Sequence, residues 1–149
     1  MTNLAQKLYE KASIADVLIR YATVLDRRDW PALDQVFLED AVTVYHGLGQ
    51  YEGLEAITEV IRTFLEACGP TQHIMTNIRV DLDGDEADAK CYLQATHAGS
   101  GDFVGKKMTM WGEYSDRLVA GPDGWRIRRR ELHTWYAEGD VGVGIKGEY

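Results

Sequence analysis

Apolar residues recur at helical spacing near the start of the chain. They stand three and four positions apart between residues 14 and 25, at Ile14, Val17, Leu18, Tyr21, Ala22 and Leu25. This spacing is typical of the buried face of an amphipathic helix. Ser13, with Asp16 three residues later, is expected to cap its start. The pattern therefore predicts a helix that begins after Ser13 and closes at Asp26.

Two more helices and a short strand are predicted before residue 70. Pro31 suits the first turn of a second helix, whose buried face is Ala32, Leu33, Val36 and Phe37. A short strand around residues 42–46 and a loop at 47–49 follow. The third helix runs from about Leu54 to Ala67, and Gly69 and Pro70 end it.

The second half of the chain has the pattern of strands. Residues 74–82 and 87–98 flank Asp83-Gly84, a dipeptide typical of a hairpin turn. Two longer strands are predicted over about 104–119 and 125–136. Helices first and a long antiparallel meander afterwards indicate an α+β fold with the helices on one side of the sheet. A strongly curled sheet of this kind would form a cone with an internal cavity.

The length of 149 residues suits one domain. We expect this domain to span residues 1–138. Residues 139–149 contain too many glycines for a stable element and are predicted to be a mobile tail.

The charge balance argues against several classes of partner. Sixteen Lys and Arg stand against twenty-four Asp and Glu, a formal net charge of −8 that repels phosphate backbones and anionic bilayers. The apolar runs are too short to span a bilayer, and residues 1–20 lack the apolar core of a signal peptide. Cys68 and Cys91 have the spacing of neither a disulfide framework nor a zinc site. We therefore expect a cytoplasmic protein with no nucleic-acid or membrane partner.

Asp26 and His73 are the strongest candidates for chemistry. Asp26 lies on the shoulder of the apolar stripe of the first helix, where its carboxylate needs a hydrogen-bond donor. His73 stands at the entrance to the first long strand. An imidazole whose N–H is directed at a carboxylate is held in one tautomer, and its other nitrogen is then a stronger base. An Asp26–His73 pair would be a general base able to take a proton from a carbon acid.

The predicted hairpin brings a second histidine close to the first. A turn centred on Asp83-Gly84 places His73 opposite about Gln94 and diagonal to His97. The two histidines would then lie within side-chain reach on one face of the sheet.

These residues also have ordinary structural interpretations. An aspartate at a helix end is commonly at the surface, and a histidine in a strand is commonly structural. His46 and His133 are expected at the surface. A solvated strand face is the simplest interpretation of Arg126, Arg128, Arg129 and Arg130. The tryptophans fit a core, although Trp111, near Met108 and Met110, could line an apolar cavity.

Several stretches resemble the SnoaL-like proteins of the nuclear transport factor 2-like superfamily. The run from Ile14 to Trp30 looks like their opening helix, and residues 37–42 (Phe-Leu-Glu-Asp-Ala-Val) are similar to their entry into the first strand. Gly53 with the helix after it, and residues 124–127 (Gly-Trp-Arg-Ile), also fit. The resemblance covers about residues 10–136. It implies an α+β cone, in which about three N-terminal helices and a curved antiparallel or mixed sheet enclose a pocket.

The polar positions resemble one branch of that superfamily, which holds scytalone dehydratase and γ-hexachlorocyclohexane dehydrochlorinase. Both enzymes use a His–Asp dyad where this chain has Asp26 and His73. Scytalone dehydratase also has a tyrosine at the position of Tyr45 and a second active-site histidine at that of His97. The resemblance implies that these four residues are catalytic. The residues expected to contact the substrate are Tyr21, Phe64, Met110 and Trp111.

The resemblance predicts a lyase of the dehydratase type that needs neither metal nor organic cofactor. Residues 108–113 (Met-Thr-Met-Trp-Gly-Glu) are more apolar than the corresponding strand of scytalone dehydratase, so a small hydrophobic cyclic substrate is expected instead of its phenolic one. Aldol cyclisation or isomerisation begins with the same proton removal, so a polyketide cyclase or isomerase stays an alternative. A non-catalytic binding domain with a vestigial dyad is another. We expect a homodimer or homotrimer that covers the outer face of the sheet with Trp125, Ile127 and Tyr136.

Overall fold

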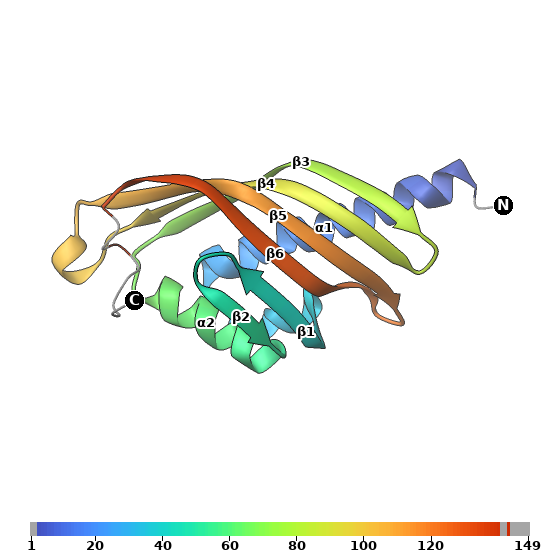
Figure 1. Ribbon diagram of the computed structural model, residues 1–149, viewed down its shortest axis with the longest axis horizontal. Helices are drawn as coiled ribbons and strands as arrows, with labels where there is room; N and C mark the ends of the chain where they lie inside the picture. Colours follow the sequence, from blue (N-terminus) through green and yellow to red (C-terminus); the bar gives the residue numbers. More distant parts are fainter. Residues whose placement is uncertain (1–2, 141–142, 144–149) are drawn as a thin grey trace.

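The protein consists of one curved, open sheet with helices against one of its faces (Figure 1). The computed structural model describes residues 3–140 and 143. In chain order the elements are α1 (Leu4–Arg27), the 3-10 helix η1 (Trp30–Gln35), β1 (Phe37–Tyr45), β2 (Gly49–Glu52), α2 (Leu54–Glu66), β3 (Thr71–Asp83), β4 (Glu86–Ala98), the 3-10 helix η2 (Gly101–Phe103), β5 (Lys107–Gly121) and β6 (Gly124–Gly139).

The sheet has six strands in the order β2-β1-β6-β5-β4-β3. β1 runs parallel to β6, and the other neighbouring strands are antiparallel. α1 packs against β3, and α2 packs against β1 and β2 on the same side of the sheet (Figure 1). The predicted α+β class is confirmed, with a mixed sheet that does not close on itself.

The core lies between the helices and the concave face of the sheet. The helical residues that are buried in it include Ile14, Leu18, Tyr21 and Leu25 from α1, and Ile57, Ile61 and Leu65 from α2. Each fully buried apolar side chain of this size contributes about 1.5–3 kcal/mol. Burial of the apolar stripe of residues 14–25 therefore holds α1 against the sheet.

α1 begins at Leu4, well before Ser13, the predicted cap. The side-chain oxygen of Asn3 accepts a hydrogen bond from the backbone N–H of Ala5 at 3.0 Å and so caps the helix. The Ser13 hydroxyl instead donates to the carbonyl oxygen of Tyr9 at 2.9 Å. Residues 4–13 include no buried side chain, so apolar periodicity could not reveal the first turns.

Residues 30–52 contain a shorter helix and more strand than predicted. Pro31 lies in the first turn as expected, but the helix is only the six-residue η1. Phe37 is the first residue of β1 instead of part of a helical face. β2 was not predicted, because four mostly exposed residues are too few to show strand alternation.

A β-bulge in β6 places Arg130 inside the core. The register with β5 shifts between Arg117 and Leu118, so that Arg128 has no partner on β5. One extra residue reverses the alternation of side chains beyond it, and Arg130 is fully buried as a result. The prediction that Arg130 belongs to a solvated strand face is wrong.

Trp125 and Ile127 face the helices and not the outer surface. Both are buried in the core, and Nε1 of Trp125 donates to Oε2 of Glu10 on α1 at 2.6 Å. The expectation that they cover an outer interface is therefore wrong. Tyr136 is about half exposed, and its part in an interface stays a prediction.

The predicted glycine-rich tail lies largely outside the described residues. Gly139 is the last residue of β6, and beyond it only Asp140 and Val143 are described. Val143 is buried against Cys68 and Met108.

Both cysteines, Cys68 and Cys91, are buried free thiols. Of the helices that the structure describes, none is long and apolar enough to cross a membrane.

Candidate active site

A cavity of about 810 Å³ lies between the α-helices and the concave face of the sheet. Its wall is mostly apolar. The polar groups that matter below are two histidines, His73 and His97, and three tyrosines, Tyr21, Tyr45 and Tyr114. An apolar cavity of this size with a few polar groups is the usual form of a small-molecule site.

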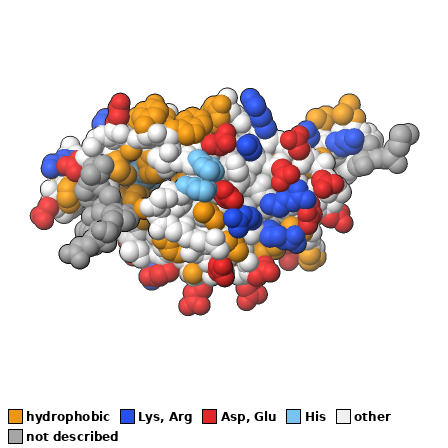
Figure 2. Space-filling model, viewed as in Figure 1, with side chains coloured by type: hydrophobic (Ala, Val, Ile, Leu, Met, Phe, Trp, Pro, Cys, Tyr) orange, Lys and Arg blue, Asp and Glu red, His pale blue; other side chains and the backbone are white. Residues whose placement is uncertain are grey.

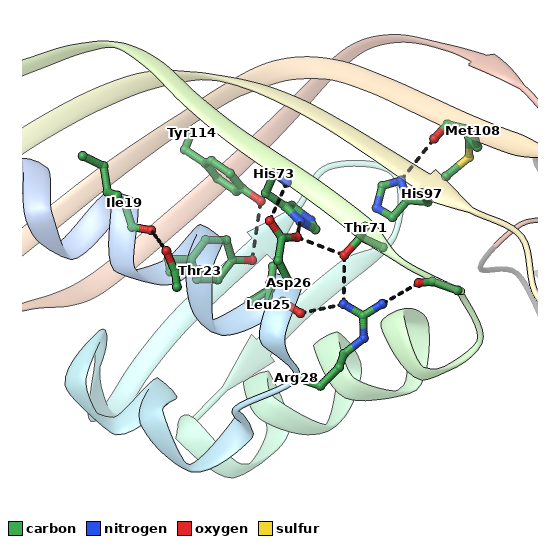
Figure 3. Close-up of polar contacts among 12 residues, drawn as sticks. Ile19, Thr23, Leu25, Asp26, Arg28, Thr71, His73, His97, Met108 and Tyr114 are labelled. Atoms are coloured by element: carbon green, nitrogen blue, oxygen red, sulfur yellow. Dashed lines mark hydrogen bonds and ion pairs between the residues drawn. The ribbon is translucent and has the colours of Figure 1, made fainter.

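Asp26 and His73 are in direct contact beside this cavity (Figure 3). Asp26 lies in the last turn of α1, and His73 lies near the start of β3. Nδ1 of His73 is 2.7 Å from Oδ1 of Asp26, and the backbone N–H of His73 donates to Oδ2 at 3.0 Å. The structure thus brings together the two residues that the sequence paired, with both carboxylate oxygens engaged.

The carboxylate determines which nitrogen of His73 carries the proton. An ionised carboxylate only accepts hydrogen bonds, so Nδ1 is the donor and Nε2 holds the lone pair. The side chain of His73 is 5% exposed and lines the cavity, whereas Asp26 does not. Nε2 is therefore on the edge of the ring away from Asp26, in a side chain that borders the cavity, and a general base requires such a free nitrogen.

Asp26 is ionised although it is partly buried. Burial alone would raise the pKa of this carboxyl group, but the hydrogen bonds from the ring and backbone of His73 and from Thr71 lower it more. The net effect is a pKa below the ordinary value. The negative charge beside Nδ1 stabilises the imidazolium that forms when Nε2 takes a proton.

Two residues that sequence reasoning missed hold the Asp26 carboxylate in place. The Thr71 hydroxyl donates to Oδ1 at 2.9 Å, and Arg28 donates to the Thr71 hydroxyl at 2.8 Å and to the carbonyl of Gly69 at 2.9 Å (Figure 3). Arg28 stands directly after α1 in the left-handed conformation, with a φ of 58°. It ties the end of α1 to the entrance of β3. A basic residue at a helix end is common for other reasons, so its position gave no signal of this role.

His97 lies diagonally across the sheet from His73. His73 is opposite Ala95 and not Gln94, so the predicted register was one residue off, but the diagonal relation holds. The two ring centroids are 5.4 Å apart and the rings are nearly perpendicular. Both rings line the cavity.

His97 is neutral at ordinary pH. Burial lowers its pKa to about 4, and the neighbouring His73 adds to this effect. Nδ1 of His97 is 3.4 Å from the carbonyl oxygen of Met108, which can only accept, so Nδ1 carries the proton. Nε2 is then an acceptor, and His97 is suited to receive a hydrogen bond from a ligand hydroxyl.

The low pKa of His97 predicts a specific dependence of stability on pH. Above about pH 6.5 neither the folded nor the unfolded chain protonates this residue, so its contribution is intact. As pH falls toward 4, the unfolded chain takes up the proton that the folded protein excludes, and about 3 kcal/mol is lost. Urea unfolding of the wild type and His97→Gln between pH 7 and pH 4 measures this loss as a change in their difference. A difference that does not vary with pH contradicts the assignment.

Three phenol groups lie together on the cavity wall. The hydroxyls of Tyr21 and Tyr114 are 3.5 Å apart, and the Tyr45 hydroxyl is buried with no hydrogen-bond partner among the residues that are described. Burial raises the pKa of Tyr45 and of Tyr114 well above the ordinary value. The phenols of Tyr45 and Tyr114 therefore stay protonated and can donate to a ligand oxygen. Sequence analysis did not identify Tyr114 as a site residue, although it predicted the strand that carries Tyr114.

A fully buried ion pair packs against two of these tyrosines, Tyr21 and Tyr114. Nε and Nη2 of Arg130 each donate to the Asp116 carboxylate at 2.7 Å. The guanidinium carbon lies 4.0 Å from the ring centre of Tyr114 and 4.3 Å from that of Tyr21. Burial alone would lower the pKa of Arg130, but the charge of Asp116 keeps it well above the ordinary value. The cation therefore stays beneath the two rings.

Phe64 and Met110, which are predicted to contact the substrate, line the cavity, but Trp111 does not. Trp111 lies on the opposite face of β5, where it stacks on Tyr136 with ring centroids 4.6 Å apart. Successive side chains of a strand point to opposite faces, so Trp111 is directed away from the side that Met110 occupies. The expectation that Trp111 contacts a substrate is wrong.

The chain shares its fold with the solved structure of an NTF2-like protein with a cystatin-like fold from Novosphingobium aromaticivorans, which is 22% identical with a TM-score of 0.75 over 96% of both chains. The SnoaL-like domain family matches residues 6–131. The chain belongs to this family. It is also 32% identical over 130 residues to the uncharacterized protein Rv2910c of Mycobacterium tuberculosis (strain H37Rv), with 83% of this chain and 84% of that protein covered.

Two solved structures illustrate the fold. A scytalone dehydratase-like protein of Novosphingobium aromaticivorans is 24% identical, with a TM-score of 0.81 over 89% of this chain and 88% of the other. A LinA-type3 hexachlorocyclohexane dehydrochlorinase of Novosphingobium barchaimii LL02 is 16% identical, with a TM-score of 0.79 over 95% and 97% of the two chains. At these identities the similarity shows a shared fold, and activity has to be argued from the site.

Proposed function

We propose that the protein is a cofactor-independent lyase of the dehydratase type, with His73 as its general base. The observation that carries the proposal is the position of His73. Its Nδ1 is held by the ionised Asp26 at 2.7 Å, while its ring lines an 810 Å³ cavity. A vestigial pair would need no open space beside the histidine.

Proton removal from carbon would begin at Nε2 of His73. The electron pair of the C–H bond moves toward a carbonyl group of the substrate, and a tyrosine hydroxyl stabilises the enolate oxygen by donating a hydrogen bond. Tyr45 fits this role because its buried hydroxyl lacks a partner within the described part of the chain. Collapse of the enolate expels a hydroxyl group on the next carbon, which leaves as water after taking the proton back from the His73 imidazolium.

His97 would position the substrate and not act as an acid. Its Nε2 accepts hydrogen bonds at neutral pH, so it can hold the hydroxyl group that is to leave. A neutral His97 cannot polarise a substrate carbonyl by donating a hydrogen bond, because its one N–H is already directed at the carbonyl oxygen of Met108.

The cavity favours a small cyclic β-hydroxy ketone as substrate. Its wall is mostly apolar, and its polar groups are neutral donors and acceptors apart from His73 of the dyad and the Glu59 carboxylate. A volume of about 810 Å³ accommodates a molecule of one or two rings. Relatives of the same fold include a scytalone dehydratase-like protein and a hexachlorocyclohexane dehydrochlorinase, in keeping with elimination chemistry.

An exchange experiment tests the proposal without knowledge of the natural substrate. A panel of cyclic ketones and β-hydroxy ketones is incubated with the protein in D₂O, and loss of the α-proton signals is followed by NMR. The wild type is expected to exchange α-protons of at least one compound and to convert the β-hydroxy compound to an enone. Asp26→Asn should exchange at least about 100-fold more slowly, because Nδ1 loses its anionic partner. Trp111→Phe, outside the cavity, is the matched control.

The outcomes separate the candidate functions. Exchange with enone formation supports the lyase. Exchange without elimination points to the cyclase or isomerase alternative, since these share only the first step. Saturable binding of a panel compound with no exchange points to a binding domain.

A further inference from the structure

Two exposed histidines and a glutamate meet on the surface of the sheet, where the end of β1 lies beside β6. Nε2 of His46 is 3.1 Å from Oε2 of Glu131, and Nε2 of His133 is 3.7 Å from the same oxygen. The three ligand atoms all lie within 4.8 Å of one another. Ligand atoms bound to a tetrahedral ion at about 2.0–2.1 Å stand roughly 3.3 Å apart, so the two distances to Glu131 are close to those of a site that holds one ion.

The parallel pairing of β1 with β6 brings these residues together from distant parts of the sequence. Tyr45 pairs with Leu132, and the backbone N–H of His46 donates to the carbonyl of Leu132 at 3.1 Å. Leu132 lines the cavity, so its neighbours Glu131 and His133 point to the outer face. Histidine side chains are visible together at the surface of this face in Figure 2.

The donor set suits a borderline divalent ion such as Zn²⁺. Two neutral imidazoles and one carboxylate are typical zinc ligands and leave a position open for water. The imidazole rings are stacked with centroids 4.0 Å apart, and both side chains are 46% exposed, so each ring can turn to direct its Nε2 at a shared ion. Nη2 of Arg129 donates a hydrogen bond to Oε1 of Glu131 at 3.0 Å. This contact orients the carboxylate and leaves Oε2 free to face the histidines.

We propose that His46, Glu131 and His133 form a surface binding site for one Zn²⁺ ion, separate from the cavity. The ion would join β1 to β6, which are neighbours in the sheet but come from opposite ends of the chain. Because the ligands are assembled only when these strands pair, bound Zn²⁺ stabilises the folded state. This site takes no part in the proposed reaction, since it lies on the other side of the sheet from His73.

Calorimetric titration of the untagged, chelator-treated chain with Zn²⁺ tests the site. We expect saturable binding of one ion per chain. His46→Asn and His133→Asn should each weaken binding at least about tenfold, and the double variant should lose it. Glu138→Gln, which removes an exposed carboxylate from the same strand, is the matched control and should bind as the wild type does.

A thermal measurement shows whether the ion acts on the fold. Zn²⁺ at about 100 times its Kd should raise the Tm of the wild type by about 5 °C or more, and leave the Tm of the double variant unchanged. Binding that persists in the double variant, or a titration with no saturation, overturns the proposal. Neither result depends on lyase activity, so this proposal and the proposed function can fail separately.

Discussion

Replacement of His73 by alanine is expected to lower turnover by about 10²–10⁴-fold, because it removes the imidazole that Asp26 holds beside the cavity and that the proposed reaction uses to take a proton from carbon. The measurement is kcat on the compound that the exchange experiment identifies. KM should change little, since the apolar wall that binds the substrate is intact. Added imidazole should restore part of the activity, because the variant leaves a space of the right size beside Asp26.

Two controls are needed to attribute the loss of turnover to the missing base and not to unfolding. Circular dichroism and the Tm must show that His73→Ala is folded. Added imidazole should restore activity to His73→Ala but not to Asp26→Asn. The Asp26→Asn variant still contains the imidazole of His73, and what it lacks is the carboxylate beside that ring. A loss of less than about tenfold in a folded His73→Ala protein would exclude His73 as the base.

The contact between Asp26 and His73 could be predicted because short-range signals determine both positions. The apolar stripe of α1 sets the angle of Asp26, and Gly69-Pro70 sets the start of β3. The hairpin at Asp83-Gly84 then locates His97 to within one residue. The outward direction of Trp111 was predictable from the sequence. Side chains alternate between the two faces of a strand, so Trp111 cannot face the cavity together with its neighbour Met110.

Other parts of the site depend on long-range packing and left no sequence signal. The burial of Arg130 follows from a bulge at Arg128, which exists only because of how β6 pairs with β5. Its partner Asp116 lies on that other strand. The link from Arg28 through Thr71 to Asp26 likewise joins segments that are adjacent only in the folded protein. Cavity volume depends on the same packing.

The buried pair of Arg130 and Asp116 predicts the largest loss of stability from a single substitution. Asp116→Ala leaves a fully buried guanidinium without its counter-charge, so the free energy of unfolding should fall by about 3–5 kcal/mol. For a chain of this length that corresponds to a fall in Tm of about 10 °C. Urea unfolding at pH 7 measures the change.

A surface ion pair on neighbouring strands supplies the matched control. Asp88 pairs with Arg117 at 2.9 Å but its side chain is 68% exposed, so Asp88→Ala should cost no more than about 1 kcal/mol. An equal cost for the two substitutions would show that the buried cation does not depend on Asp116.

Removing both charges separates the stability of the core from the function of the cavity wall. The double variant Asp116→Leu with Arg130→Met should recover most of the stability that Asp116→Ala loses, because no unpaired charge remains in the core. It also removes the cation that lies 4.0 Å and 4.3 Å from the rings of Tyr114 and Tyr21. If the pair serves only the fold, ligand affinity returns together with stability. If it also orients the phenols for the ligand, the recovered protein still binds the ligand more weakly than the wild type does.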